Sequence, residues 1–194
     1  MRYHVYFLKD ILEHADPVMV VDNALRASAS AVGLEFSYQD SLENERGTIT
    51  HKWCELLDGK MEVSLVLDHI LPGRYLQIAA PTDEDCDDLG RELRERLSLA
   101  SVEDLVKVAR AADADPGALQ RLGMGVNRAH NREAQELLAR GLSSPDIEVR
   151  YHAAMGASFA RWRELAQPLV DARRRERDEG IQRVLDFAVQ MCCE

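Results

Sequence analysis

The stretch that decides the fold is residues 48–80, which read TITHKWCELLDGKMEVSLVLDHILPGRYLQIAA. Apolar and polar side chains alternate along it, as they do in strands that bury one face. Asp58-Gly59 is typical of a tight hairpin turn, and Pro72-Gly73 is typical of a type II turn. The stretch is therefore predicted to form a three-stranded antiparallel meander.

Registers centred on the two turns predict which face of the meander is buried. The residues that share this face in the three strands are Cys54, Leu56, Met61, Val63, Leu65, Leu67, Leu76, Ile78 and Ala80. Two independent turns select the same set, and a slip of one residue would turn the set to solvent. The same register places Glu55 opposite Glu62, a mildly repulsive pair.

The flanks of the meander add two helices and two strands. Asp16 and Pro17 are typical of a helix start, and the apolar stripe that follows predicts a helix over residues 17–32, closed by Gly33. Residues 2–8 and 34–39 have the composition of strands. A capping box of Thr82 and Asp85 predicts a second helix, whose apolar positions are Cys86, Leu89, Leu93 and Leu97. Residues 1–97 are thus predicted to be an α+β domain, with an antiparallel sheet and two helices.

Residues 98–194 are predicted to be helical throughout. Capping and proline signals predict six short helices, which begin near Ser101, Asp115, Asn131, Ser144, Trp162 and Asp178. A shift of 31 positions places Met124-Gly125 on Met155-Gly156 and Arg132-Glu133 on Arg163-Glu164. A period near thirty with two helices is typical of stacked helical hairpins.

One part of the helical half carries a family resemblance. Residues 144–159, SPDIEVRYHAAMGASF, and residues 163–172, RELAQPLVDA, resemble a HEAT-like repeat of the short bacterial, PBS-lyase type. The matching residues are Asp146, Val149, Arg150, Ala153, Ala154, Gly156 and Pro168. The match covers one repeat well and two more loosely, and Leu119-Gln120 stands where Val-Arg is expected. The resemblance implies a short α-helical-repeat domain over residues 98–194, of a kind that usually binds proteins; some relatives are bilin lyases or DNA glycosylases.

Charge is distributed unevenly between the two halves. The chain has 34 acidic and 24 basic residues, a net charge of −10. Residues 1–97 hold 19 acidic against 10 basic residues, which is −9, and residues 98–194 hold 15 against 14, which is −1. An acidic surface repels phosphate groups, so nucleic-acid and membrane partners are disfavoured. No apolar run approaches the roughly 18 residues of a membrane span, and a cytoplasmic protein is expected.

Motifs for metal, cofactor or covalent chemistry are not recognised. His51 and Cys54 lie three residues apart on a predicted strand, so their side chains face opposite sides. The sequence has no phosphate-binding glycine loop and no nucleophile motif. The four cysteines, Cys54, Cys86, Cys192 and Cys193, are expected to be reduced thiols. No catalytic residue, metal site or cofactor is therefore predicted.

Three features are candidates for partner binding. The densest acidic run consists of Asp83, Glu84, Asp85, Asp87 and Asp88. It could meet a basic partner, or it could cap its helix and form pairs along it. The basic cluster of Arg173, Arg174 and Arg175 could grip an acidic group, or complement the end of its helix. Trp162 could be an exposed anchor, or could pack between helices.

These features predict a non-catalytic protein-binding module: an adaptor, a regulator or an immunity-type inhibitor of a basic bacterial protein, acting by charge-steered occlusion. The alternative is an enzyme of unrecognised type with its site between the two domains. Its first acid–base candidates are Glu55, Glu62, Asp68 and His69. A self-associating structural protein is a third hypothesis, which predicts a large apolar patch. The partner's identity and the oligomeric state stay open.

Overall fold

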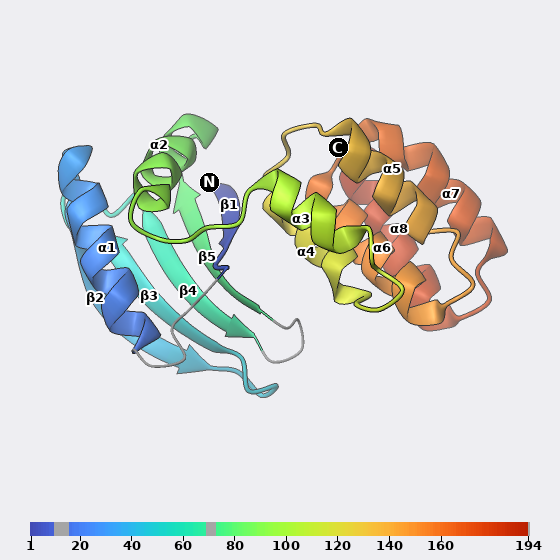
Figure 1. Cartoon of the computed structure of the whole chain (residues 1–194), viewed down its shortest axis with the longest axis horizontal. Helices are drawn as coiled ribbons and strands as arrows, with labels where there is room; N and C mark the ends of the chain where they lie inside the picture. Colours follow the sequence, from blue (N-terminus) through green and yellow to red (C-terminus); the bar gives the residue numbers. More distant parts are fainter. Residues whose placement is uncertain (10–15, 69–72, 194) are drawn as a thin grey trace. The chain divides into compact units, whose positions relative to one another are not determined.

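The computed structural model describes residues 1–9, 16–68 and 73–193 of the chain. It divides into two compact units, Met1–Ala100 and Ser101–Glu194. The boundary predicted between residues 97 and 98 lies three residues before this division. The first unit combines a sheet with two helices and the second is helical, which is the predicted α+β class (Figure 1).

The sheet of the first unit is antiparallel and has five strands within the described residues. They are β1 (Arg2–Phe7), β2 (Phe36–Glu43), β3 (Ile49–Glu55), β4 (Glu62–Asp68) and β5 (Gly73–Ala80). Their order across the sheet is β1-β5-β4-β3-β2. The first strand therefore pairs with the last, and β2 forms the opposite edge of the sheet (Figure 1).

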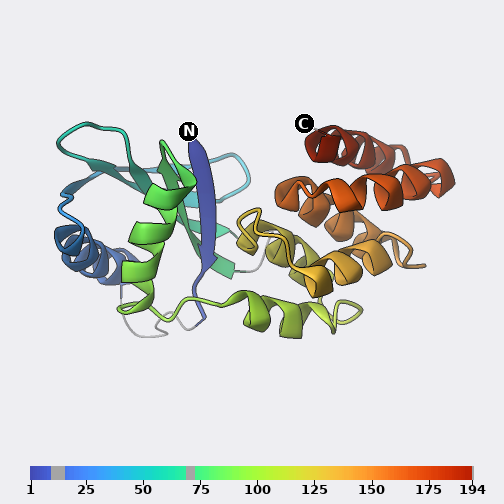
Figure 2. The ribbon, with the colours of Figure 1, turned by 90° about the horizontal axis from the view of Figure 1, so that it is seen from above.

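Two helices, α1 (Pro17–Ala31) and α2 (Asp83–Arg94), cover one face of this sheet (Figures 1 and 2). Helix α1 begins as predicted, with the Asp16 side chain accepting a hydrogen bond from the backbone N–H of Val18 at 2.9 Å. It ends at Gly33, whose φ of 73° lets the N–H of Leu34 reach the carbonyl of Ala29 at 2.8 Å. The predicted capping box of Thr82 and Asp85 starts α2.

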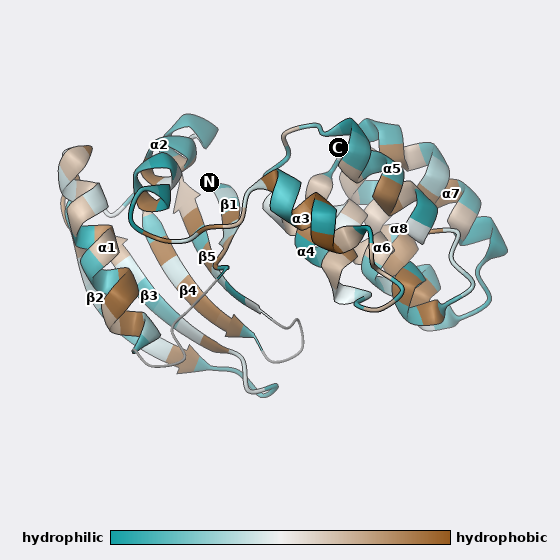
Figure 3. Cartoon of the chain, viewed as in Figure 1, coloured by the Kyte–Doolittle hydropathy of each residue, from teal (hydrophilic) through white to brown (hydrophobic). Residues whose placement is uncertain are grey.

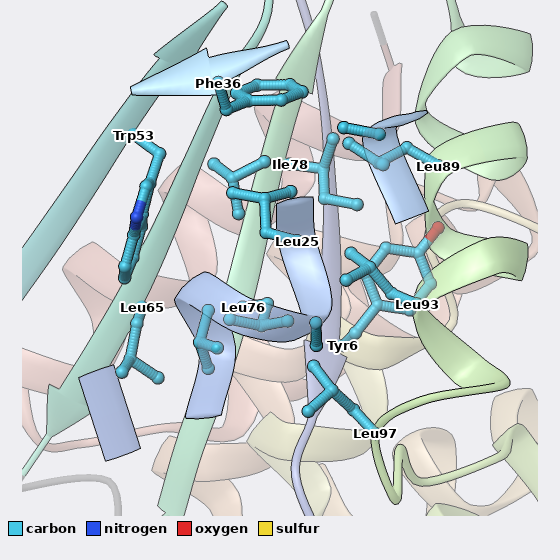
Figure 4. Close-up of a cluster of buried hydrophobic side chains, with 14 of the residues drawn as sticks. Tyr6, Leu25, Phe36, Trp53, Leu65, Leu76, Ile78, Leu89, Leu93 and Leu97 are labelled. Carbon is cyan, nitrogen blue, oxygen red and sulfur yellow. The ribbon is translucent and has the colours of Figure 1, made fainter. Parts of the chain in front are cut away.

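The core of the first unit lies between the sheet and the two helices. Trp53, Leu65 and Leu76 from the strands are fully buried, and so are Leu25 of α1 and Leu89 of α2. Figure 4 shows these side chains pointing toward one another from the two layers. In Figure 3 the same strands alternate between apolar and polar residues. Full burial of one such leucine contributes about 2 kcal/mol, so the cluster holds the sheet against both helices.

The predicted burial of β4 and β5 is confirmed, whereas the predicted register of β3 is wrong by one residue. Trp53 pairs with Val63, and Cys54 pairs with Glu62. The indole of Trp53 therefore takes the core position that was predicted for Cys54, and Leu56 is exposed. The physical reason is the hairpin, because Glu55 donates its N–H to the carbonyl of Met61 at 3.0 Å and encloses a five-residue loop, not a two-residue turn.

The predicted turn between β4 and β5 is also displaced. Asp68 pairs with Gly73, so Gly73 belongs to the strand ladder and not to the centre of a turn. Pro72, the other half of the predicted turn, lies outside the described residues. The face assignment survives because the register differs from the prediction by an even number of residues, which leaves each side chain on the predicted side.

The second unit contains six α-helices within the described residues. They are α3 (Val102–Ala109), α4 (Gly117–Gly125), α5 (Arg132–Gly141), α6 (Ile147–Ala160), α7 (Ala166–Arg175) and α8 (Glu179–Cys193). A short 3-10 helix, η1 (Arg163–Leu165), precedes α7. Consecutive helices pack as pairs, and α4, α6 and α8 contact one another in succession (Figure 2). Whether these pairs are HEAT-like repeats stays a prediction.

The helix starts of the second unit follow the local signals closely, with two shifts. The capping box of Ser101 and the cap at Asn131 form as predicted. Helix α4 starts after Pro116 without a side-chain cap. Helix α6 starts later than Ser144, because the side chain of Asp146 accepts the N–H of Glu148 at 2.8 Å and acts as the cap.

Helices α4 and α6 cross at a point where only glycine fits. A Cβ atom added to Gly123 would overlap the backbone of Gly156, and one added to Gly156 would overlap the carbonyl oxygen of Leu119. Both obstacles are helix backbone, which cannot rotate out of the way as a side chain can. The two glycines therefore set the close approach of the helices in the second unit.

Candidate functional site

The acidic run of α2 makes its main contacts inside the first unit. The carboxylate of Asp83 lies 3.1 Å from Nε2 of His4, and that of Asp87 lies 3.1 Å from Nδ1 of the same ring. Arg2 approaches Asp83 at 3.6 Å. Both basic residues belong to β1, so two acids of the run connect the edge strand β1 to the first turns of α2.

The ring of His4 is almost fully enclosed, with 3% of the residue exposed. Each of its two ring nitrogens lies within hydrogen-bond distance of a carboxylate of α2. Tyr6 lies next to it on β1 and donates its hydroxyl hydrogen to the carbonyl of Cys86 at 3.2 Å. Burial, and next the charge of Asp87, raise the pKa of Tyr6. These contacts hold the edge strand β1 against helix α2.

Two of the other acids in the run also have partners within the unit. Thr82 donates its hydroxyl hydrogen to Asp85 at 2.6 Å within the capping box, and Asp88 forms an ion pair with Arg91. Glu84 is exposed. The run therefore matches the alternative of capping and pairing more closely than that of a surface turned as a whole to a partner.

The basic cluster of α7 is partly engaged as well. Arg173 lies 2.7 Å from Asp186 of α8, and Arg174 lies 3.8 Å from Asp171. Arg175 donates to the carbonyl of Asp171 at 3.1 Å and to the hydroxyl of Ser143 at 3.2 Å. The cluster thus connects α7 to its neighbours and leaves Arg175 without a carboxylate partner among the described residues.

Trp162 does not form the exposed anchor that was one of its two predicted roles. The residue is 5% exposed, and its indole N–H donates to the carbonyl of Arg128 at 3.0 Å. The ring of His130 meets it edge to face, at 5.2 Å between centroids. The indole is enclosed because it bridges the segment after α4 and the start of η1, which is the packing role.

A second acidic surface lies along β2 and its two ends, and we call it the β2 acidic edge. Its members are the exposed residues Glu35, Asp40, Glu43 and Glu45. Within the described part of the chain, none of the four carboxylates forms an ion pair. Asp40 lies opposite Lys52 in the ladder, but the ammonium of Lys52 lies 3.2 Å from Glu62. Lys52 is therefore engaged on β4 and not with Asp40.

Sequence reasoning missed the β2 acidic edge because the α2 run is denser. A signal was present, since residues 27–45 contain four acids and no lysine or arginine. The strand prediction also ended at residue 39, whereas β2 continues to Glu43. Longer pairing with β3 places Asp40 and Glu43 on an edge strand and not in a loop.

The backbone of β2 also has hydrogen-bonding groups on the open edge of the sheet. Among the described strands β2 pairs with β3 alone, so one side of it presents N–H and C=O groups that can pair with another strand. A bulge at Gln39 interrupts the ladder, and the amide of that side chain donates to the hydroxyl of Ser37 at 2.6 Å. Acidic side chains on an edge repel a second acidic edge and attract a cationic segment.

The acid–base candidates of the enzyme hypothesis do not all converge. Glu55 is 9% exposed and lies on the helix-covered face of the sheet, with Trp53. Glu62 lies on the opposite face, where it pairs with Lys52. Asp68 ends β4, and His69 lies outside the described residues. Glu55 and Glu62 were predicted to be neighbours across the ladder, and the corrected register separates them.

The cysteines are all free thiols in the structure. Cys86 and Cys192 are buried, and burial is the main cause that raises the pKa of each thiol to about 11. Thiols with such pKa values are protonated at neutral pH, and a thiol is a much weaker nucleophile than a thiolate. These two side chains therefore act as small core residues.

Comparisons with protein-family models, with curated proteins and with solved structures found no match for this chain. Across residues 1–9, 16–68 and 73–193, no three or more His, Cys, Asp or Glu side chains are grouped so that they could hold a metal ion. In the same ranges, every helix is too short or too polar to cross a bilayer. Charge and strand geometry are the features that remain for a functional proposal.

Proposed function

We propose that the chain is a non-catalytic protein-binding module whose first unit binds a basic protein. The observation that carries the proposal is the β2 acidic edge, an open strand edge with four exposed carboxylates that form no ion pair with a described residue. An extended basic segment of the partner adds to the sheet next to β2. Its backbone supplies hydrogen bonds, and its lysines and arginines supply the match in charge.

Charge also accounts for how the partner reaches the surface. The first unit carries a net charge of −9 and the second −1, so the attraction for a basic protein originates in the first. Such steering raises association rates and weakens with salt, because the screening length is about 10 Å at 0.1 M. Once bound, the module covers the basic surface of the partner and keeps other molecules from it. An adaptor, a regulator or an immunity-type inhibitor would act in this way.

The proposal is tested with a fluorescent peptide of alternating lysine and valine as the probe. The full chain binds it with an affinity that falls as salt rises from about 50 mM to about 300 mM. The variant Glu35→Gln, Asp40→Asn, Glu43→Gln, Glu45→Gln weakens binding by about tenfold, since each exposed pair contributes about 0.2–1 kcal/mol. Fluorescence anisotropy measures both effects.

Two matched controls make the experiment specific. The variant Asp58→Asn, Glu84→Gln, Glu92→Gln, Glu95→Gln removes the same number of charges elsewhere in the unit, and we expect it to lose no more than about twofold. A peptide of equal charge with N-methylated backbone cannot donate to the strand edge, and we expect it to bind more weakly. Equal losses in the two protein variants, or equal binding of the two peptides, would contradict the proposal.

A further inference from the structure

Two cavities of the second unit adjoin at the link between α5 and α6. The larger has a volume of about 450 Å³ and the smaller about 200 Å³. Ser143 and Ser144 of this link line both cavities, so the two cavities are neighbours on either side of it. Their other walls come from the C-terminal ends of α3, α5 and α7 and from the start of α6. Together they form a groove at one end of the helix pairs, which we call the arginine groove.

Four arginines line the arginine groove, and they divide into two kinds. Arg110 lies against Glu133, with Nε 2.8 Å from the carboxylate, and Arg150 lies against Glu176, with Nε at 2.7 Å. These two guanidinium groups are neutralised. Arg140 in the larger cavity and Arg175 in the smaller one have no carboxylate partner within the described residues.

The partners of Arg175 are the backbone oxygen of Asp171 and the hydroxyl of Ser143, which places this guanidinium beside the junction of the two cavities. Arg140 lies on the other side of that junction, one residue before the end of α5. Asp113 and Glu176 also line the groove, and Glu176 is already paired with Arg150, so the two unpaired arginines face one unpaired acid, Asp113, among the described lining residues. The groove is thus a cationic site in a chain whose net charge is −10.

The floor of the larger cavity is apolar. Leu119, Leu137 and Val149 contribute to it, and each is less than 9% exposed. A phosphate ion would fill only part of such a volume and would leave this floor unused. A nucleic acid would bring its whole phosphate backbone toward an acidic protein. A peptide can place two carboxylates on the two guanidinium groups and an apolar side chain on the floor.

We infer that the arginine groove binds an acidic segment of another protein, with Arg140 and Arg175 as its charge-recognising residues. The site is distinct in place and in sign of charge from the β2 acidic edge. It therefore adds a second partner class to the binding module and does not depend on the basic partner of the first unit.

The test uses a fluorescent peptide of alternating glutamate and leucine as the probe, on the full chain. The double variant Arg140→Gln, Arg175→Gln is expected to weaken binding by about tenfold, because both charge-assisted contacts are lost. The matched control is Arg132→Gln, Arg183→Gln, which removes two exposed charges of the same unit that lie outside the groove, and no more than about a twofold change is expected. Circular dichroism confirms that both variants fold.

Three results would overturn the inference. Equal weakening in the two variants would mean attraction by charge alone. Inorganic phosphate that displaces the peptide at equal concentration would assign the groove to a small anion. Sedimentation that shows oligomers of the full chain, lost in Arg140→Gln, Arg175→Gln, would make a second copy the occupant.

A glutamine and leucine peptide serves as the uncharged reference and is expected to bind at least about tenfold more weakly.

Discussion

The two units are nearly equal in length but differ in how they are held together and in what they offer outside. The first packs large side chains such as Trp53 and Leu65 between a sheet and two helices. The second packs helix backbones closely at Gly123 and Gly156. Among the described residues, the first leaves four carboxylates without an ion pair along β2 and its two ends, and the second leaves the guanidinium groups of Arg140 and Arg175 without a carboxylate partner. The two proposed binding surfaces thus differ in the sign of their charge and in the secondary structure that carries them.

The largest loss of stability from a single substitution is expected where α4 and α6 cross. Gly156→Ala puts a methyl group into the carbonyl oxygen of Leu119, so α4 and α6 must separate, at a cost of about 3 kcal/mol. The chain has two tryptophans, one in each unit, and Trp53→Phe leaves Trp162 as the fluorescent reporter of the second. Denaturant unfolding in that background measures the loss.

The control for this substitution is Gly180→Ala. Its new methyl group would meet only the side chain of Asp178, at 3.1 Å, and alanine is the better helix former by about 1 kcal/mol. We expect stability within about 1 kcal/mol of the parent. If Gly156→Ala were equally well tolerated, the second unit would not depend on close backbone packing.

A second prediction concerns the ion pair that closes the groove of the second unit. The Arg150 guanidinium, aided by the backbone N–H groups of Arg177 and Asp178, lowers the pKa of Glu176 from 4.5 to about 2. A carboxyl with a lowered pKa contributes stability above its unfolded value, and this stability is lost as the pH falls from about 4.5 to about 2. At about 1.4 kcal/mol for each pKa unit, the contribution at neutral pH is at most about 3 kcal/mol.

Glu176→Gln should remove this part of the pH dependence. Unfolding of the second unit, followed by Trp162 from pH 6 to pH 3, should show a shallower slope in the variant. Glu164→Gln, an exposed change in η1, serves as the reference and should keep the parent slope. Identical slopes in all three proteins would mean that the Arg150–Glu176 pair does not stabilise the unit.

A third and smaller effect is expected in the first unit. His4→Gln leaves at least one of Asp83 and Asp87 without its partner, and we expect a loss of about 1–2 kcal/mol, read from Trp53 in a Trp162→Phe background. His130→Gln removes the exposed ring that meets Trp162 edge to face, and we expect the second unit to lose about 0.5 kcal/mol, less than the loss at His4, read from Trp162. Equal losses of stability in the two variants would mean that the contacts of His4 with Asp83 and Asp87 do not stabilise the first unit.

Local chemistry explains which structural predictions succeeded. The caps at Asp16, Thr82 and Asn131 depend on hydrogen bonds within a few residues, and they form as predicted. The register of β3 depends on the length of a hairpin, which Asp58-Gly59 did not determine, although Gly59 does have a φ of 62°. The core position therefore passed to Trp53, whose indole N–H reaches Asp22 on α1 at 2.8 Å.

The candidate site was harder to predict because it depends on distant partners. Asp83 and Asp87 are joined to His4 across about eighty positions of the chain, a contact that no local pattern contains. The number of acids in the α2 run is therefore a poor guide to how many of its carboxylates are available to a partner. The sparser acids of β2 remain exposed because Lys52, the nearest cation across the ladder, pairs with Glu62 instead.

Hydrogen exchange of the full chain, with and without the lysine and valine peptide, shows whether β2 is the surface that binds a basic segment. We expect the peptide to slow exchange in residues 36–43, where backbone groups of β2 gain partners, and to leave residues 83–88 of α2 unchanged. Protection of the α2 segment with none in β2 would contradict it, and would place the binding surface on the acidic run.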